Sequence, residues 1–337
     1  MNVREIAQAA NVSPATVSLV LNGRPGVKTD TRQRVAQLLL ENGYEIRQTR
    51  SSRETVRLMF LRYCGAKHEQ FDPRYDFFVE IMNGIEYQAA EYGFQLSIAN
   101  ADVSSLDSTI RHAAKTFSGI LLFGSELEQE SVPVLLQSHC PLITIDAHFP
   151  SCPIHCVNID NEGGIFQAVQ HLHKLGHTKI GYLTSTAGNG AIPTRFQSFQ
   201  SALQQYGLSY FPEYTFKLPP HLKLAENQMQ KILDTRPPLP TAFAAANDSL
   251  TLGAMQALQQ SGWRIPEDIS LIGFDDAYLT SMSNPPLTSV SVPKEMIGRT
   301  AVRQMKHLLD CPGDSTIYKI QLCTKLIVRH SSDTPSC

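Results

Sequence analysis

The segment from Val3 to Gly23 constrains the fold of this 337-residue chain more than any other. Apolar residues recur at spacings of three and four on both sides of Asn11-Val12, which predicts two short helices joined by a tight turn. Ser13 is a good N-cap for the second helix, and Pro14 suits its first position because the amide that proline lacks would have no partner there. The pattern therefore predicts a helix-turn-helix unit. The expected buried positions are Val3, Ile6, Ala7, Ala10, Val17, Val20 and Leu21.

The outward face of the second helix predicts contact with DNA. Its side chains are small or hydroxylated with few charges, which is unusual for a solvated surface but lets a helix approach a major groove closely. The same pattern leaves open a helical interaction domain that has no DNA partner. The expected DNA contacts in and around this helix are Val3, Arg4, Ser13, Pro14, Ala15, Thr16, Ser18, Leu19, Asn22, Lys28 and Thr31.

A third helix is predicted from the segment that begins at Val27 and stops at Asn42-Gly43, with Val35, Leu38 and Leu39 on its apolar side. Residues 1–54 contain eight Lys and Arg against five Asp and Glu, a balance of +3. The whole chain stands at −2, so the remaining residues carry −5. A basic segment on an acidic chain is expected of a nucleic-acid-binding module attached to a ligand-binding domain.

Beyond Gln48, apolar runs alternate with longer amphipathic segments. This alternation predicts parallel sheets that are covered by helices on both faces. The predicted strands are 56–63, 94–99, 120–123, 142–146, 180–184, 242–246 and 269–274. The predicted helices are 77–92, 106–117, 132–139, 163–175, 194–206, 224–233 and 249–260.

Composition excludes several classes of protein. An apolar fraction of 42% with 18% charged residues indicates a globular chain with a large core. No apolar leader follows Met1 and no run of 18 apolar residues occurs, so we expect a cytoplasmic chain that is neither secreted nor membrane-spanning. Seven cysteines, an odd number, favour reduced thiols. Cys152-Pro153-Ile154-His155-Cys156 has poor zinc spacing, so we expect a free-thiol loop and no metal or cofactor.

Ordered motifs along almost the whole chain resemble the lactose-repressor family of bacterial transcription regulators. In the first 45 residues they add to the helix-turn-helix segment, and farther along they recur in the same order as in that family. The motifs are Asn22-Gly23, Val27, Thr31-Arg32, Gly43-Tyr44, Leu175-Gly176-His177, the stretches 246–248, 252–255 and 265–276, Pro285-Pro286-Leu287-Thr288 and Val328-Arg329-His330-Ser331.

The resemblance implies a small all-α helix-turn-helix head and an α/β effector domain similar to type I periplasmic binding proteins, with two parallel-sheet lobes. The implied divisions are 1–46 for the head, 47–55 for a basic linker and 56–337 for the effector domain. Lobe 1 would comprise about 56–157 and 292–318, and lobe 2 about 161–287 and 320–331. The chain would cross between the lobes near 157–161, near 287–292 and close to Lys319, and three crossings make a hinge.

The sequence departs from the family in its linker. Relatives carry a Pro-Asn-x-x-Ala-Arg-x-Leu pattern whose leucine enters the minor groove. Residues 45–55 have neither the proline nor the leucine, so we expect Arg47, Arg50 and Arg53 to contact phosphates without wedging the duplex. Leu19 also replaces a residue that is often polar or basic, which favours reading by shape and thymine-methyl contact.

Polar residues that follow the predicted strands form a candidate effector site. Ligands of open α/β sheets bind beyond the carboxyl ends of the strands. Carboxylate, amide and guanidinium groups at these ends suit the hydroxyls of a sugar or nucleoside. The resemblance points to the same positions and adds an aromatic pair that could cover an apolar ligand face. The expected ligand contacts are Phe77, Phe78, Asp146, Arg195, Asn247 and Asp275.

Other interpretations remain open at this site. Asp248 could be the N-cap of the helix that begins at Ser249, and Asp276 could belong to a turn. Phe77 and Phe78 could be core residues. Arg195 has no acidic neighbour in the sequence, so we expect it to need an external partner. Val292, Lys294 and the stretch 218–224 lack the stacking rings of relatives, so the sugar cannot be inferred.

The favoured function is a ligand-responsive transcription regulator, in particular a repressor that a carbohydrate releases from DNA. One alternative is an α/β sugar-processing enzyme fused to a DNA-binding head, although no G-x-S-x-G, P-loop or H-E-x-x-H motif occurs. The other is a sugar-binding protein that never contacts DNA. A single head reads one half-site, so we expect a homodimer on a pseudo-palindromic operator. No heptad run follows Arg329, which favours a dimer over a tetramer.

Overall fold

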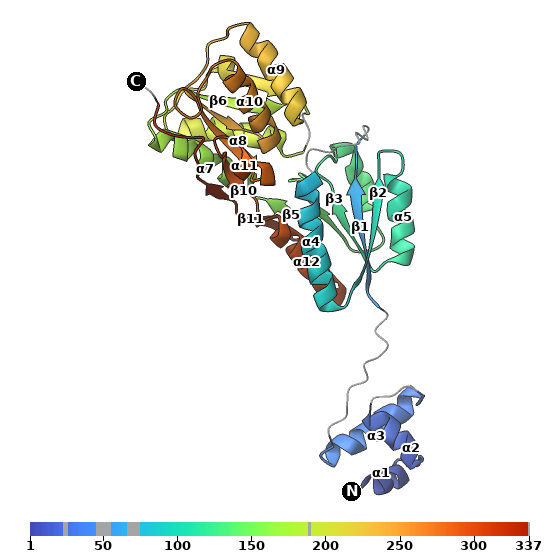
Figure 1. The fold of residues 1–337 in the computed structure, drawn as a ribbon. Coiled ribbons are helices and arrows are strands. Elements are labelled where there is room, and N and C mark those ends of the chain that lie inside the picture. The colour runs from blue at the N-terminus through green and yellow to red at the C-terminus, as the bar shows by residue number, and fades with distance from the viewer. Residues whose placement is uncertain (23–25, 45–54, 66–74, 188–189, 336–337) are drawn as a thin grey trace. The chain divides into compact units, whose positions relative to one another are not determined.

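A computed structural model describes residues 1–22, 26–44, 55–65, 75–187 and 190–335 of the chain. The chain divides into two compact units, Met1–Val56 and Arg57–Cys337. The first is helical and the second contains two α/β lobes (Figure 1). The two-lobed α/β fold with a helical head is the architecture that the sequence predicts.

The head consists of α1 (Val3–Ala9), α2 (Pro14–Leu21) and α3 (Thr29–Glu41). Asn2 and Glu5 form a capping box at the start of α1, and the Ser13 side chain caps α2. The core of the head is built from the apolar sides of all three helices. Its buried members are Ile6, Ala7, Ala10, Val17, Val20, Val35 and Leu39, with Val3, Leu21 and Leu38 partly buried against them.

Lobe 1 has a six-stranded parallel sheet in the order β11-β5-β4-β3-β1-β2. The strands are β1 (Arg57–Tyr63), β2 (Gln95–Ala101), β3 (Gly119–Phe123), β4 (Leu142–Ile145), β5 (His155–Ile159) and β11 (Lys319–Leu322). The helices are α4 (Tyr75–Tyr92), α5 (Leu106–Thr116), α6 (Val132–Leu136), α12 (Lys294–Asp310) and the 3₁₀ helix η1 (Gln129–Ser131).

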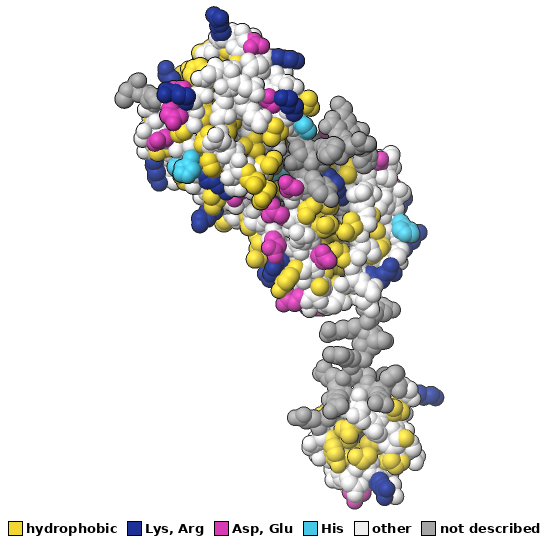
Figure 2. Space-filling view, viewed as in Figure 1, with side chains coloured by type: hydrophobic (Ala, Val, Ile, Leu, Met, Phe, Trp, Pro, Cys, Tyr) yellow, Lys and Arg dark blue, Asp and Glu magenta, His cyan; other side chains and the backbone are white. Residues whose placement is uncertain are grey.

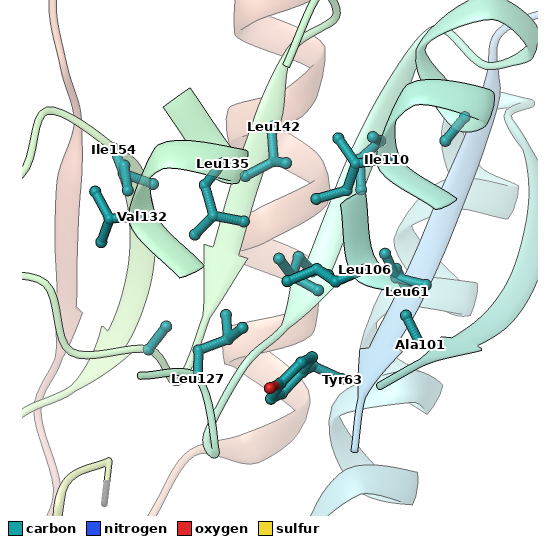
Figure 3. Packing of buried hydrophobic residues seen from close by; sticks show 14 of the residues in the cluster. Leu61, Tyr63, Ala101, Leu106, Ile110, Leu127, Val132, Leu135, Leu142 and Ile154 are labelled. Carbon is teal, nitrogen blue, oxygen red and sulfur yellow. The ribbon is translucent and has the colours of Figure 1, made fainter. Parts of the chain in front are cut away.

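The two faces of this sheet bury different side chains because residues alternate along each strand. Leu61 and Tyr63 point into an apolar cluster under α5 and α6 (Figure 3). Phe60 precedes Leu61 and therefore points to the other face of the sheet. There it stacks on Phe78 of α4, with ring centroids 5.4 Å apart. Helices α4 and α12 lie side by side on that second face (Figure 1).

Lobe 2 has a six-stranded sheet in the order β12-β10-β9-β8-β6-β7, in which only β12 is antiparallel to its neighbour. The strands are β6 (Ile180–Ser185), β7 (Thr215–Leu218), β8 (Ala242–Ala245), β9 (Ser270–Asp275), β10 (Thr288–Ser291) and β12 (Lys325–Ile327). The helices are α7 (Asn161–Lys174), α8 (Ile192–Gln205), α9 (Leu222–Asp234), α10 (Asp248–Gln260), α11 (Tyr278–Met282) and the 3₁₀ helix η2 (Pro212–Tyr214).

The chain passes between the lobes after β5, after β10 and between β11 and β12. The third passage lies a few residues beyond the predicted Lys319, because Lys319–Leu322 still pairs with β5 in lobe 1. The segment predicted to be a free-thiol loop is also partly a strand, since Cys156 lies within β5. Both Cys152 and Cys156 are free cysteines.

His177 joins the end of the chain to the lobe 2 sheet and makes stability depend on pH. The ring is 1% exposed, and its Nε2 lies 2.8 Å from the Asp333 carbonyl while its Nδ1 lies 2.9 Å from the Thr241 hydroxyl. Burial lowers the pKa of His177 below the ordinary value for histidine, which is about 6.5. The unfolded chain therefore binds a proton that the folded chain resists, so the stability that depends on neutral His177 is fully present above about pH 6.5 and is lost as the pH falls below it.

We expect the melting temperature to fall by a few degrees or more between pH 7.5 and pH 5.5. Thermal unfolding followed by circular dichroism measures this, and His177→Gln should lessen the pH dependence. The exposed His139 provides a matched control, because His139→Gln should leave it unchanged. Equal pH dependence in wild type and in both variants would contradict this assignment.

Candidate DNA-binding and effector-binding sites

Helix α2 presents the face that the sequence predicts for DNA, because its apolar side is buried in the head. Val17 and Val20 are buried. Of the polar groups, the Ser13 hydroxyl accepts the Thr16 amide at 3.1 Å, and the Asn22 amide donates to the Ser18 carbonyl at 2.9 Å. The exposed members of the face are Ser13, Pro14, Ala15, Ser18 and Asn22, and Thr16 and Leu19 are half-buried.

The flanking residues predicted to contact DNA differ in exposure. Arg4 and Lys28 are exposed, whereas Val3 and Thr31 are half-buried. Val3 also packs against the core of the head. Arg47 and Arg50, with the linker hypothesis that depends on them, lie outside the described residues.

Arg195 is buried at the carboxyl end of the lobe 2 sheet and has internal partners. Its Nε donates to Asn161 Oδ1 at 2.7 Å and its Nη1 to the Ala246 carbonyl at 2.5 Å. Its Nη2 lies 3.3 Å from Asp275 Oδ1, and its guanidinium covers the Phe274 ring at 3.7 Å. The expectation that Arg195 needs an external partner is therefore wrong, since its carboxylate partner comes from a strand 80 residues away.

Asp275 and Asp276 form a strained turn beside this arginine. Both have left-handed backbone conformations, with φ of +105° and +52°, which are rare for residues other than glycine. The Asp276 carboxylate accepts Arg329 Nη2 at 2.7 Å and the Thr280 hydroxyl at 3.2 Å. Such strain persists only where surrounding groups hold it, and here it aims two carboxylates from consecutive residues at different arginines.

The buried Asp248 side chain holds the Asp275-Asp276 segment in place through hydrogen bonds. It is 2% exposed, its Oδ2 accepts the Ala277 amide at 2.7 Å and its Oδ1 accepts the Ser289 hydroxyl at 2.6 Å. The Ser289 oxygen in turn accepts the Asp276 amide at 3.2 Å. A Cβ on Gly273 would lie 2.1 Å from Asp248 Oδ1, so glycine is needed there. Burial and the charge of Asp275 raise the pKa of Asp248 well above its usual range.

The N-cap of α10 is Asn247, because its side chain accepts the Leu250 amide at 3.0 Å. The interpretation of Asp248 as that cap is wrong, and Asp248 is instead the first residue of the helix. The interpretation of Asp276 as a structural residue fits better, because it lies in the short loop between β9 and α11. It also holds an ion pair.

We expect Asp248→Ala to destabilise the chain by about 2 kcal/mol, because it leaves a buried amide and a buried hydroxyl without an acceptor. Asp248→Asn should cost less, since the Asn oxygen can accept the Ala277 amide and its NH₂ can donate to Ser289. The midpoint of urea unfolding measures both. An alanine variant as stable as the wild type would show that the Asp275-Asp276 segment keeps its conformation without the hydrogen bonds to Asp248.

Lys294 connects the lobes next to the turn. It is the first residue of α12 in lobe 1 and its side chain is 4% exposed. Its Nζ donates to Glu80 Oε1 of α4 at 3.0 Å and to the Asp276 carbonyl of lobe 2 at 3.1 Å. A second contact joins the lobes at His148 Nε2, which lies 3.3 Å from the Thr194 hydroxyl. Residues adjacent to predicted ligand contacts thus form the contacts between lobes.

Phe77 and Phe78 begin α4 and are 7% and 6% exposed. Phe78 stacks on Phe60, and the Arg62 guanidinium lies 4.7 Å from the centre of its ring. Phe77 packs against Phe123 at 6.4 Å. These contacts favour the core interpretation for Phe78.

Asp146 follows β4 in lobe 1 and is half-buried, with a left-handed φ of +55°. Asp146 lies two residues before His148. The His148 ring contacts Thr194, the residue before Arg195, so this contact between the lobes brings the segments that carry Asp146 and Arg195 together. Arg195 also binds directly to Asp275 and to the carbonyl of the residue before Asn247.

Several residues of this network escaped the sequence patterns. Asn161 would have been found by the strand-end rule had β5 been recognised, because it follows that strand. Ser289 carries no local signal, and Arg329 lies in the motif Val328-Arg329-His330-Ser331, which does not reveal its ion pair because Asp276 is distant in sequence. His221, in a stretch without an obvious stacking ring, follows β7 and has a buried Nδ1 that lacks a hydrogen-bond partner among the described residues. An unpaired buried polar atom indicates a missing partner.

Two classes of site find no support among the described residues. No group of three or more His, Cys, Asp or Glu side chains could hold a metal ion there. No helix of the described part of the chain is long and apolar enough to span a membrane.

A helix-turn-helix head in the same chain as two parallel-sheet lobes, with a polar network at the lobe junction, defines a DNA-binding regulator with an effector domain. Residues 2–45 match the family described as bacterial regulatory proteins, lacI family, and residues 169–332 match the periplasmic binding protein-like domain. The repressor PurR of Aliivibrio salmonicida is 32% identical over 307 residues, covering 89% of this chain and 90% of PurR. The chain belongs to the LacI family of bacterial transcription regulators.

Two further comparisons agree. The repressor CytR of Escherichia coli K12 is 31% identical over 318 residues, covering 89% of this chain and 87% of CytR. A solved complex of the transcriptional regulator CelR with cellobiose has a TM-score of 0.71 and 26% identity, covering 98% of this chain and 99% of CelR.

Proposed function

We propose that this chain is a transcriptional repressor whose affinity for its operator is controlled by a small polyhydroxylated ligand bound between the lobes of the effector domain. The observation that carries the proposal is the Arg195–Asp275 pair beside the Asp276–Lys294 contact between the lobes. A ligand that displaced or engaged Asp275 would act one residue from that contact. Ligand binding and lobe rotation would then be coupled.

The relatives support the two halves of this proposal separately. PurR and CytR are both named HTH-type transcriptional repressors, and CelR is solved with a sugar. None is described by its name as an enzyme, so we propose that the chain binds its ligand without transforming it.

The proposal assigns DNA contacts to the α2 face and its flanking residues, within a head of residues 1–46, and retains the linker 47–55. It assigns ligand contacts to the domain of residues 56–337. The proposal includes a homodimer, because one head reads a single half-site of the operator. It places this homodimer in the cytoplasm. The proposed ligand contacts are Asp146, Arg195, Asn247 and Asp275, with His221 added and with Phe77 as a candidate apolar contact, while Phe78 is assigned to the core.

Two experiments on the full chain test the halves. Selection from a random duplex library should enrich a pseudo-palindrome, and failure to enrich any sequence would contradict the DNA half. Melting temperatures against a panel of sugars and nucleosides test the other half. A ligand at a hundred times its dissociation constant should add about 2.7 kcal/mol of stability. The absence of any shift would contradict the carbohydrate half alone.

A further inference from the structure

We propose that the effector carries no phosphate or carboxylate and is an uncharged sugar or nucleoside. The inference rests on the proposed function, because it concerns the ligand of the same site. The inference is based on the ion pairs and hydrogen bonds that already occupy the basic groups that a negatively charged ligand would need.

Each cation of the network at the lobe junction is already paired with a carboxylate. Arg195 lies against Asp275, with side chains 6% and 12% exposed. Lys294 lies against Glu80. Arg329 and Asp276, the third pair, approach to 2.7 Å. A bound phosphate needs positive charge and hydrogen-bond donors to compensate its desolvation, and basic groups that are already paired supply less of both.

The remaining donors of these cations are also committed. Arg195 Nη1 donates to the Ala246 carbonyl, Lys294 Nζ to the Asp276 carbonyl at 3.1 Å, and Arg329 Nη1 to the Leu287 carbonyl at 2.7 Å. An anion would have to break a buried ion pair and also leave a buried carbonyl unpaired. A hydroxyl group avoids both costs, because it can donate to a carboxylate that keeps its arginine.

The balance of charge points the same way. The network contains three cations, which are paired with the carboxylates of Glu80, Asp275 and Asp276, and the buried Asp248, whose raised pKa favours its neutral form. Asp146 adds a further carboxyl group from lobe 1. Acidic side chains also gather around α4 and α12 on the face drawn in Figure 2. The raised pKa of Asp248 has the negative charge of Asp275 as its second cause.

Matched pairs of compounds test this inference on the full chain at constant ionic strength. The pairs are D-ribose with ribose 5-phosphate, D-glucose with glucose 6-phosphate, and adenosine with its monophosphate, and inorganic phosphate is titrated alone. We expect the phosphorylated partner of any compound that binds to bind at least about 100-fold more weakly. Repulsion by one net charge at about 5 Å gives this factor at an effective dielectric constant near 20. Calorimetry or the melting temperature measures the ratio.

A variant pair separates local from general charge effects. Glu80→Gln removes the carboxylate partner of Lys294. It should reduce the ratio of the affinity for the neutral compound to the affinity for its phosphorylated partner. Glu213→Gln makes the same charge change at an exposed residue just before β7, which is the end of that strand away from the candidate site. It should leave the ratio of the two affinities unchanged.

The outcomes distinguish this inference from the proposed function. Binding of a phosphate ester as tight as that of its neutral partner would overturn the inference. Saturable stabilisation by inorganic phosphate that disappears in Arg195→Ala would also overturn it. If no sugar, nucleoside or phosphate ester binds, the carbohydrate proposal fails and this inference fails with it, whereas binding of a phosphorylated sugar alone overturns only the inference.

Discussion

Arg195→Ala is expected to abolish the rise in melting temperature that a bound sugar produces, with affinity lowered by about 100-fold or more. Truncating one member of a buried, hydrogen-bonded charge pair costs about 2–5 kcal/mol, much of it from the charge left behind. Here that charge is Asp275, whose side chain is 12% exposed. The variant should also be less stable without ligand. Thermal unfolding with and without the sugar, together with calorimetry, measures both effects.

A matched control uses another arginine that pairs with an aspartate in lobe 2. The Arg264 side chain is 69% exposed and bonds to Asp268, so Arg264→Ala should change neither ligand binding nor stability appreciably. If Arg195→Ala unfolds, Arg195→Lys keeps the charge but loses the fork that reaches three partners, and it should bind the sugar weakly. Unchanged sugar affinity in a folded Arg195 variant would show that the ligand binds elsewhere.

Ala15→Glu is expected to weaken operator binding by about 100-fold or more without destabilising the head. Ala15 is exposed on α2, so a larger side chain meets no packing there. On DNA it would hold the helix away from the groove and bring a negative charge toward the phosphates. A glutamate in the first turn of α2 also favours the helix dipole, so the melting temperature should not fall. Fluorescence anisotropy with the selected operator measures the affinity.

Gln33→Glu makes the same charge change at an exposed residue of α3 and provides the control. It should reduce affinity only slightly. An equal loss in both variants would indicate a general charge effect, and an unchanged affinity of Ala15→Glu would exclude the α2 face as the surface that enters the groove.

The sequence predicts most of the fold because its strongest signals are local. Each helix of the head places its apolar residues at helical spacing, and the buried strands of both sheets are continuous apolar runs. The missed strand β11 has alternating exposed and half-buried positions and lies at a sheet edge. Its pairing with β5 depends on residues more than 150 positions away, which no local pattern reveals. Helix α12 was missed although Ile297, Ala301 and Met305 carry a helical period.

The candidate site was only partly predictable for a related reason. The strand-end rule identifies Asn247 and Asp275, which directly follow predicted strands, and Arg195, which begins the helix after the predicted strand 180–184. It cannot tell that Arg195 already has a carboxylate partner, since that partner is brought near by the sheet. Phe78 shows the reverse case, because an aromatic residue at a suggestive position is covered by Phe60 and by Arg62.

The affinity of the full chain for its selected operator, measured with and without the sugar that stabilises it, tests the central claim most directly. A proposed repressor that releases DNA on binding its ligand should bind the operator about 5- to 150-fold more weakly when the sugar is saturating. Arg195→Ala should bind the operator equally well in both conditions. An operator affinity that a bound sugar leaves unchanged, or increases, would contradict control of this repressor by release from DNA.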